Sequence, residues 1–206
     1  MKRLLLPLLA LTLVLLGAAA FLLLPGLGDP PGFKGTELPE PGPAPALTLA
    51  DPSGRQISLA DFAGEVRLLY FGYTFCPDIC PTTMADLAKV QQEVDDDGGE
   101  VQVIMITVDP ARDTPEVMAE YAASFHPDFI GLAGSPEEIA TVAERWGVFY
   151  EAHEGTAATG YLVDHTARVF LVDKAGRYRL TYAFETPPED IIADLKILLR
   201  ERSEEE

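Results

Sequence analysis

Apolar and polar positions along the chain predict alternating strands and helices. Near-continuous apolar runs at Val66–Phe71 and Val101–Val108 are typical of strands buried on both faces. Helical spacing follows each run, over Thr82–Val94 and then from Asp113 to about Phe125. The first half of the chain therefore contains two strand–helix units.

Turn and capping signals predict the remaining elements. The strand–helix–strand–helix order, closed by a hairpin and a helix, predicts an α/β sandwich of thioredoxin type. The further expected elements are an N-terminal hairpin of Ala46–Leu49 and Gln56–Leu59, a helix from the capping box Ser135–Glu138 to about Gly147, a hairpin of Val169–Val172 and Tyr178–Phe184, and a last helix from Thr186 to about Arg200.

The N-terminus predicts export and a membrane anchor. Leu4–Leu24 carries no charge and as a helix would span about 31 Å, the thickness of a bilayer's hydrocarbon core. Lys2 and Arg3 place the N-terminus in the cytoplasm and the rest of the chain outside. A cleaved signal peptide is the alternative, since residues 17–20 are small, but the apolar run continues past them. We expect residues 1–24 to be a transmembrane helix or a signal sequence.

Composition divides the rest of the chain into a linker, one domain and a tail. Residues 25–45 hold seven Pro and five Gly, which predicts an extended linker. Residues 46–200 are long enough for one domain with its own core, and residues 201–206 form an acidic tail. The net charge of −18 argues against nucleic acid as a partner, because phosphate contacts need clustered Lys and Arg.

The two cysteines point to chemistry. Cys76 and Cys80 follow a buried strand and lie where a helix begins. Free N–H groups at a helix start lower a thiol pKa, and a pair four residues apart can hold one ion or form a disulfide. Two thiolates suit Cu(I), and an added imidazole would also accommodate Cu(II). Dithiol reductases of the thioredoxin type usually place two residues between their cysteines, and this chain has three.

Other candidate ligands are less distinctive. From the residues alone, His126, His153 and His165 are each better explained as surface or capping histidines. Met84 and Met105 lie in periodic apolar segments, so core packing explains them better than copper ligation. The sequence therefore leaves the third ligand open.

Four sequence segments, in order, resemble the Sco/SenC copper chaperones of cytochrome c oxidase assembly. The resemblance covers about residues 45–200, and the segment with the cysteines is the most specific. The first segment is Tyr70–Met84, and the second is Thr107–Pro110 together with Arg112–Pro115. The third is Gly131–Gly134, and the fourth is Val163–Thr166 followed by Phe170–Asp173.

This resemblance implies a thioredoxin-like fold with an inserted hairpin and a copper site of Cys76, Cys80 and His165 that takes Cu(I) and Cu(II). It implies a single-pass protein of the cytoplasmic membrane whose C-terminal domain faces the periplasm or cell exterior. The implied partner is cytochrome c oxidase subunit II, to which copper is delivered or whose cysteines are reduced. Another periplasmic copper chaperone or a thiol reductant is a further partner.

Three alternatives stay open from the sequence. A membrane-tethered thiol–disulfide oxidoreductase would use Cys76 and Cys80 as redox-active thiols. A peroxidase-like relative would need a single activated cysteine with a nearby Thr and Arg, a constellation that the sequence does not show around Cys76. A redox-responsive sensor would need a signalling partner. Asp78, between the cysteines, is expected to cap the helix or to orient a ligand.

Overall fold

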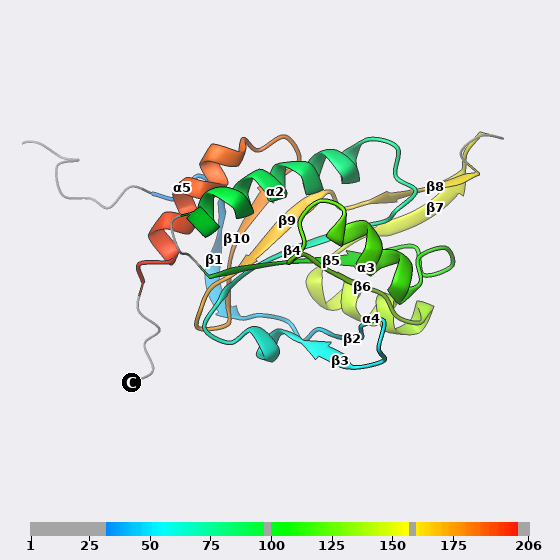
Figure 1. Ribbon diagram of the computed structural model, residues 1–206, viewed down its shortest axis with the longest axis horizontal. Coiled ribbons are helices and arrows are strands. Elements are labelled where there is room, and N and C mark those ends of the chain that lie inside the picture. The colour runs from blue at the N-terminus through cyan, green and yellow to red at the C-terminus, as the bar shows by residue number, and fades with distance from the viewer. Residues whose placement is uncertain (1–31, 97–99, 157–159, 202–206) are drawn as a thin grey trace, which may run out of the picture. The chain divides into compact units, whose positions relative to one another are not determined.

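The computed structural model describes residues 32–96, 100–156 and 160–201, and their core is a six-stranded mixed sheet. The strand order is β1-β10-β9-β4-β5-β6 (Figure 1). These strands are β1 Thr36–Pro43, β4 Val66–Gly72, β5 Val101–Thr107, β6 Ile130–Leu132, β9 Arg168–Val172 and β10 Arg177–Ala183. Two separate hairpins are β2 Thr48–Ala50 with β3 Gln56–Ser58, and β7 Tyr150–Glu154 with β8 Tyr161–His165. The helices are η1 Leu59–Phe62, α2 Ile79–Asp96, α3 Pro115–Ala123, α4 Pro136–Trp146 and α5 Pro188–Leu198.

The centre of the sheet is formed by β4 and β5. Every residue of β4 is buried, and the two strands run parallel, with Gly72 opposite Thr107 at their carboxyl ends. The loops that leave these two ends therefore start side by side. In open α/β sheets, binding sites gather at this edge.

Helices cover both faces of the sheet. In Figure 1, α2 and α5 lie side by side on one face, and α4 lies on the opposite one. Trp146 of α4 packs against Phe170 and Phe71 of the sheet at ring distances of 5.6 and 6.2 Å. This burial of large aromatic surface fixes the sheet that carries the site.

Local sequence signals account for several helix ends. The expected capping box forms: Ser135 accepts the Glu138 N–H at 3.2 Å, and Glu138 accepts the Ser135 N–H at 2.8 Å. Gly147 ends the same helix at φ 66°, a left-handed conformation that glycine adopts without strain. The predicted N-terminal hairpin and the hairpin β9–β10 are also confirmed.

The prediction of a linker over residues 25–45 is wrong for its second half, because β1 pairs with β10 as the edge strand of the main sheet. Its three prolines are tolerated because an edge strand leaves many N–H groups unpaired. Just before it, the buried Asp194 of α5 accepts the N–H groups of Lys34 and Gly35, both at 2.8 Å. Main-chain pairing of this kind has no apolar signature in the sequence. The domain thus begins at about Phe33.

Other boundaries also differ from the sequence prediction. Helix α2 begins at Ile79 and includes Cys80, and β6 was not expected as a strand. The hairpin β7–β8 stands before the last two strands, where the family resemblance implies an inserted hairpin. Glu201, assigned to the tail, is hydrogen-bonded to Arg179 at 3.1 Å. The expected membrane segment lies outside the described residues. Within those residues, none of the helices is both long enough and apolar enough to cross a bilayer.

Candidate metal centre

Cys76 lies in the loop between β4 and α2, and Cys80 lies in the first turn of α2. Cys80 is fully buried and Cys76 is partly exposed, and both are free thiols. The Cys80 N–H donates to Cys76 Sγ at 3.4 Å, so the sulfur takes up a free N–H of the helix start. Asp78 contributes through its main chain: its carbonyl accepts the Thr82 N–H at 3.1 Å.

This geometry separates the acidities of the two thiols. Hydrogen bonding to the Cys80 side chain, and then to the His165 side chain and to backbone N–H groups, lowers the pKa of Cys76 to about 3 against the opposing effect of burial. The same contact with Cys76, together with burial, raises the pKa of Cys80. At neutral pH the pair therefore holds one accessible thiolate and one buried thiol.

Alkylation of Cys76 by iodoacetamide is expected to stay nearly constant from about pH 8 down to about pH 5. A lowered pKa keeps the thiolate populated below the ordinary thiol range, so the rate falls only near the lowered value. Mass spectrometry of the modified peptide measures it. His165→Ala removes one stabilising contact and should shift the fall to higher pH. A rate that drops tenfold per pH unit below pH 8 in the unchanged chain would contradict this reading.

His165 is the last residue of β8 and faces the cysteines. Its Nε2 lies 3.4 Å from Cys80 Sγ. The ring is held edge-on by Tyr70 and Tyr73, with centroid distances of 6.1 and 6.0 Å. Its Nδ1 is buried and has no hydrogen-bond partner among the described residues. The structure thus brings together the three side chains singled out by the family resemblance, from segments 85 residues apart.

The other two histidines make different contacts. His126 lies between Asp95 and Asp128, with nitrogen–oxygen distances of 3.6 and 3.9 Å. His153 lies in β7, and its Nδ1 is 3.6 Å from Asp164. Contacts with neighbouring carboxylates account for both positions. Met84 and Met105 are fully buried in the core, as predicted.

Gly72 is a residue of the site that sequence reasoning missed. A Cβ built on it would lie 2.8 Å from Tyr70 Cε1, 3.0 Å from Cys80 Sγ and 3.1 Å from Met105 Cε. Real Cβ atoms tolerate such distances only if the neighbours move. The absence of a side chain at the end of β4 therefore lets the Cys80 sulfur settle against the sheet.

Gly72→Ala is expected to displace the Cys80 sulfur, to weaken copper binding about tenfold and to destabilise the fold by about 1–3 kcal/mol. Isothermal titration and urea unfolding measure the two effects. Gly42→Ala is the control, since its added Cβ would meet nothing closer than 4.0 Å. Unchanged copper affinity in Gly72→Ala would show that the sulfur position is not set by this contact.

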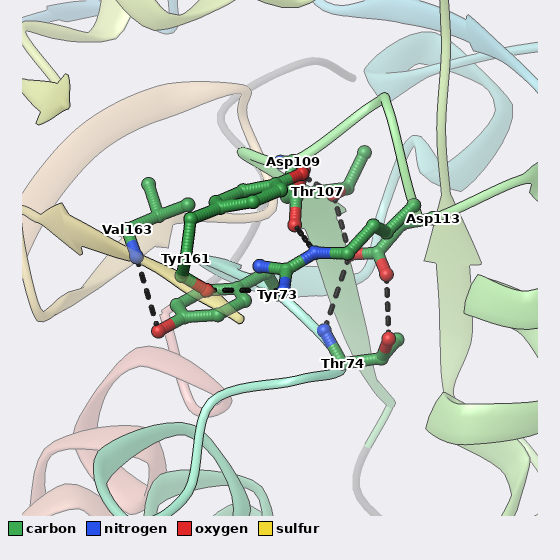
Figure 2. A network of polar contacts seen from close by, with 8 residues as sticks. Tyr73, Thr74, Thr107, Asp109, Asp113, Tyr161 and Val163 are labelled. Carbon is green, nitrogen blue, oxygen red and sulfur yellow. Dashed lines mark hydrogen bonds and ion pairs between the residues drawn. The ribbon is translucent and has the colours of Figure 1, made fainter. Parts of the chain in front are cut away.

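The loop from Thr107 to Asp113 borders the centre. Asp113 accepts from the Thr74 hydroxyl at 2.5 Å and from the Thr107 hydroxyl at 2.7 Å (Figure 2). Burial raises the pKa of Asp113, and these hydrogen bonds oppose the rise. The contacts fix the segment that leads to Cys76.

The donor set suits a soft ion. Two sulfurs and one imidazole nitrogen are ligands that Cu(I) and Cu(II) accept, and the partly exposed Cys76 leaves one side open to exchange. The buried Nδ1 of His165 and its neighbouring tyrosines hold the ring with Nε2 toward the sulfurs. The residues present therefore fit copper.

The family model described as SCO1/SenC matches residues 42–200. The chain is similar to apo Sco1 from Thermus thermophilus, with 40% identity and a TM-score of 0.71 over 83% of this chain and 99% of that one. It is also similar to copper-bound ScoI from Arabidopsis thaliana, with 32% identity and a TM-score of 0.71 over 77% of this chain and 99% of that one.

Two further structures extend the comparison. BsSco is described as a member of the Sco family of cytochrome c oxidase assembly proteins with a disulfide switch, and it shares 26% identity and a TM-score of 0.62 over 81% of this chain and all of that one. A thioredoxin-family thiol:disulfide interchange protein from Chlorobium tepidum has 17% identity and a TM-score of 0.51 over 78% of this chain and 97% of that one, a likeness of fold alone. The fold is thus thioredoxin-like, and the chain belongs to the SCO1/SenC family.

Proposed function

We propose that this protein binds copper through Cys76, Cys80 and His165 and delivers it to the dinuclear copper site of cytochrome c oxidase subunit II. The observation that carries the proposal is the contact of His165 Nε2 with Cys80 Sγ, next to the Cys76 sulfur at a helix start. A copper-bound relative and a relative described as an oxidase assembly protein support it.

The two oxidation states of copper favour different ligands of the site. The two sulfurs hold Cu(I), which favours soft thiolates, and the imidazole of His165 adds the nitrogen that Cu(II) favours. Loading requires the Cys80 thiol to lose its proton, because the thiolate is the metal ligand. Copper binding therefore releases a proton that the metal-free pair retains.

Delivery is a ligand exchange without net electron transfer. An incoming thiolate of the partner binds Cu(I), one protein sulfur leaves, and the exchange repeats until the ion is held by the partner. Cys76 is the first sulfur to be replaced, since Cys80 is fully buried. A disulfide between the two cysteines would block loading, which couples loading to redox state.

The location follows from the same proposal. Residues 1–24 anchor the protein in the cytoplasmic membrane, and the copper domain faces the periplasm or cell exterior. In an oxidising compartment the two cysteines would form a disulfide unless a reductant keeps them reduced. The copper itself would come as Cu(I) from another chaperone.

A second function, thiol–disulfide exchange, is favoured by the separated thiol acidities. The Cys76 thiolate would attack a substrate disulfide, and Cys80 would resolve the mixed disulfide, so the substrate gains two electrons and the protein forms its own disulfide. This activity needs no histidine ligand. It therefore survives His165→Ala, whereas copper delivery does not.

An anaerobic copper titration of the reduced full-length chain in mild detergent, followed by transfer to the isolated copper domain of subunit II, tests the proposal. We expect one tight copper per chain and its appearance in the acceptor. No tight binding would reject the copper function, and disulfide exchange without transfer would favour the oxidoreductase.

Two exposed aromatic side chains border the centre. Phe75 precedes Cys76 and is 57% exposed. Phe149 is 62% exposed, and its N–H donates to Thr166, the residue after His165. Exposed aromatic residues of this kind are common anchors of protein interfaces.

Phe149→Ala is therefore expected to slow copper transfer about tenfold while leaving the copper affinity unchanged. Stopped-flow transfer measurements with subunit II provide the rate. Val117→Ala, another exposed apolar residue, is the control and should leave the rate unchanged. Equal rates for Phe149→Ala and the unchanged chain would remove this side chain from the docking surface.

A further inference from the structure

The guanidinium of Arg112 lies among three aromatic rings next to the metal centre. Its central carbon is 3.7 Å from the ring centroid of Tyr161, 4.7 Å from that of Phe75 and 5.7 Å from that of Tyr73. All three distances fall within the range of cation–π attraction. The side chain is only 18% exposed, so these contacts are partly shielded from water.

The rings belong to two different segments of the site. Phe75 and Tyr73 lie on the loop that carries Cys76, and Tyr161 begins β8, which ends in His165. Arg112 itself lies on the loop after β5. One cation thus contacts both the segment that carries the cysteines and the strand that carries the histidine.

Polar contacts fix the same arrangement. Arg112 Nε donates to Asp109, and Nη1 donates to the Tyr161 carbonyl at 3.1 Å. The Tyr161 hydroxyl also donates to Asp109 (Figure 2). The Asp109 carboxylate, which is buried, therefore holds both the cation and the ring on which the cation stacks.

The Tyr161 side chain lies on the face of β8 that carries His165. Alternate residues of a strand share a face, so Tyr161, Val163 and His165 point the same way. The Val163 N–H donates to the Tyr73 hydroxyl at 3.3 Å (Figure 2). The strand is thus tied to the rest of the site at residues 161 and 163, immediately before the histidine.

We propose that Arg112 is a positioning residue that, by joining Tyr161 to Phe75 and Asp109, sets the place of His165 relative to the two cysteines. The proposal rests on the proposed copper function for its consequence, because His165 matters as a ligand. Among the described residues, Arg112 contacts Asp109, Tyr161 and the rings of Tyr73 and Phe75, and none of these is a proposed metal ligand. It therefore acts through β8.

Lysine cannot replace arginine in this role. Its ammonium retains the charge and still attracts a carboxylate, but it lacks the planar surface for stacking. Its donors also stand on one nitrogen, so they do not reproduce the fork by which Nε and Nη1 of Arg112 reach Asp109 and the Tyr161 carbonyl. Arg112→Lys therefore tests the geometry of the clamp without removing its charge. Arg179→Lys is the matched control, because Arg179 is 15% exposed, pairs with Asp173 and lies 5.4 Å from the Phe33 ring.

The control residue lies away from the cysteines. Asp173, its partner, follows Val172, which is opposite Arg67 at the start of β4. The cysteines follow the other end of β4. A general loss of stability would therefore appear in both lysine variants, and a local effect on the hairpin only in Arg112→Lys.

The first experiment uses the reduced, metal-free full-length chain and measures hydrogen exchange of the β8 amides. We expect Arg112→Lys to speed exchange at Val163 at least about tenfold, with no change in Arg179→Lys. Unchanged exchange at Val163, or equal acceleration in both variants, would overturn the proposal. This result does not depend on whether the chain binds copper.

The second experiment follows Cu(II) and Cu(I) binding in the same variants. We expect Arg112→Lys to weaken Cu(II) binding about tenfold and to shift the thiolate-to-copper absorption band, with a smaller effect on Cu(I), which the sulfurs hold. In the His165→Ala background the substitution should have no further effect. A Cu(II) loss of the same size without His165 would overturn the proposal.

The outcomes separate the two claims. If the unchanged chain binds no copper, the proposed function fails, and the amide exchange alone decides whether Arg112 holds the hairpin. If the chain binds copper and Arg112→Lys alters neither Cu(II) affinity nor the absorption band, the positioning role fails and the copper function stands.

Discussion

Cys76→Ser and Cys80→Ser are each expected to weaken Cu(I) binding by at least about 100-fold. Loss of a residue that only supports a metal ligand already costs about 10- to 100-fold in affinity, so loss of a sulfur ligand should cost at least as much. Serine retains the size of the side chain but offers a hard oxygen that Cu(I) binds poorly. Competition with a chromophoric Cu(I) chelator under anaerobic conditions measures the affinity.

Met84→Leu is the control for this measurement. Met84 offers the chain's other type of sulfur and is fully buried on α2, near the cysteines in sequence. Leucine conserves its volume, so the fold should tolerate the exchange. We expect unchanged copper affinity. Binding that survives either serine variant within about threefold, or that is lost in Met84→Leu, would contradict the assigned sulfur ligands.

Asp194→Ala is expected to destabilise the domain by about 3–5 kcal/mol. The carboxylate is completely buried and accepts hydrogen bonds from the N–H groups of Lys34 and Gly35 and from the Tyr182 hydroxyl at 3.1 Å. Alanine would leave three donors without a partner inside the protein. Urea unfolding followed by the fluorescence of Trp146, the single tryptophan, measures the loss.

The same substitution should also release the N-terminal strand, so cleavage by trypsin after Lys34 should become faster in Asp194→Ala. Asp86→Ala is the control: its surface pair with Lys89 is expected to contribute at most about 1 kcal/mol. A loss below about 1 kcal/mol in Asp194→Ala, or unchanged cleavage, would show that this contact does not hold the strand.

The central fold was readable from the sequence because its signals are local. The apolar runs of β4 and β5 and the capping box at Ser135 each depend on neighbouring residues, and the structure contains all of them. The placement of the cysteines around the start of α2 follows from the same kind of signal. Strands and helices were therefore predictable where burial or capping produces a local pattern in the sequence.

The errors arose where main-chain contacts decide the structure. β1 joins the sheet through backbone pairing with β10 and through Asp194, which lies more than 150 residues from Lys34. Its prolines and glycines resemble a linker because an edge strand buries little apolar surface.

The metal centre was only partly predictable. The spacing of Cys76 and Cys80 indicated a site, but His165 could be chosen among the histidines only through the family resemblance. The roles of Gly72 and Arg112 depend on contacts between distant segments, with the sulfur and with Tyr161 respectively. No local pattern marks such contacts, so only the folded chain reveals them.

X-ray absorption spectroscopy of the copper-loaded, full-length chain tests the central claim most directly. The account predicts two sulfur neighbours around Cu(I) and, in the Cu(II) form, an additional imidazole nitrogen that disappears in His165→Ala. A copper environment with fewer than two sulfurs, or an imidazole signal that persists without His165, would contradict the assignment of Cys76, Cys80 and His165 as the copper site.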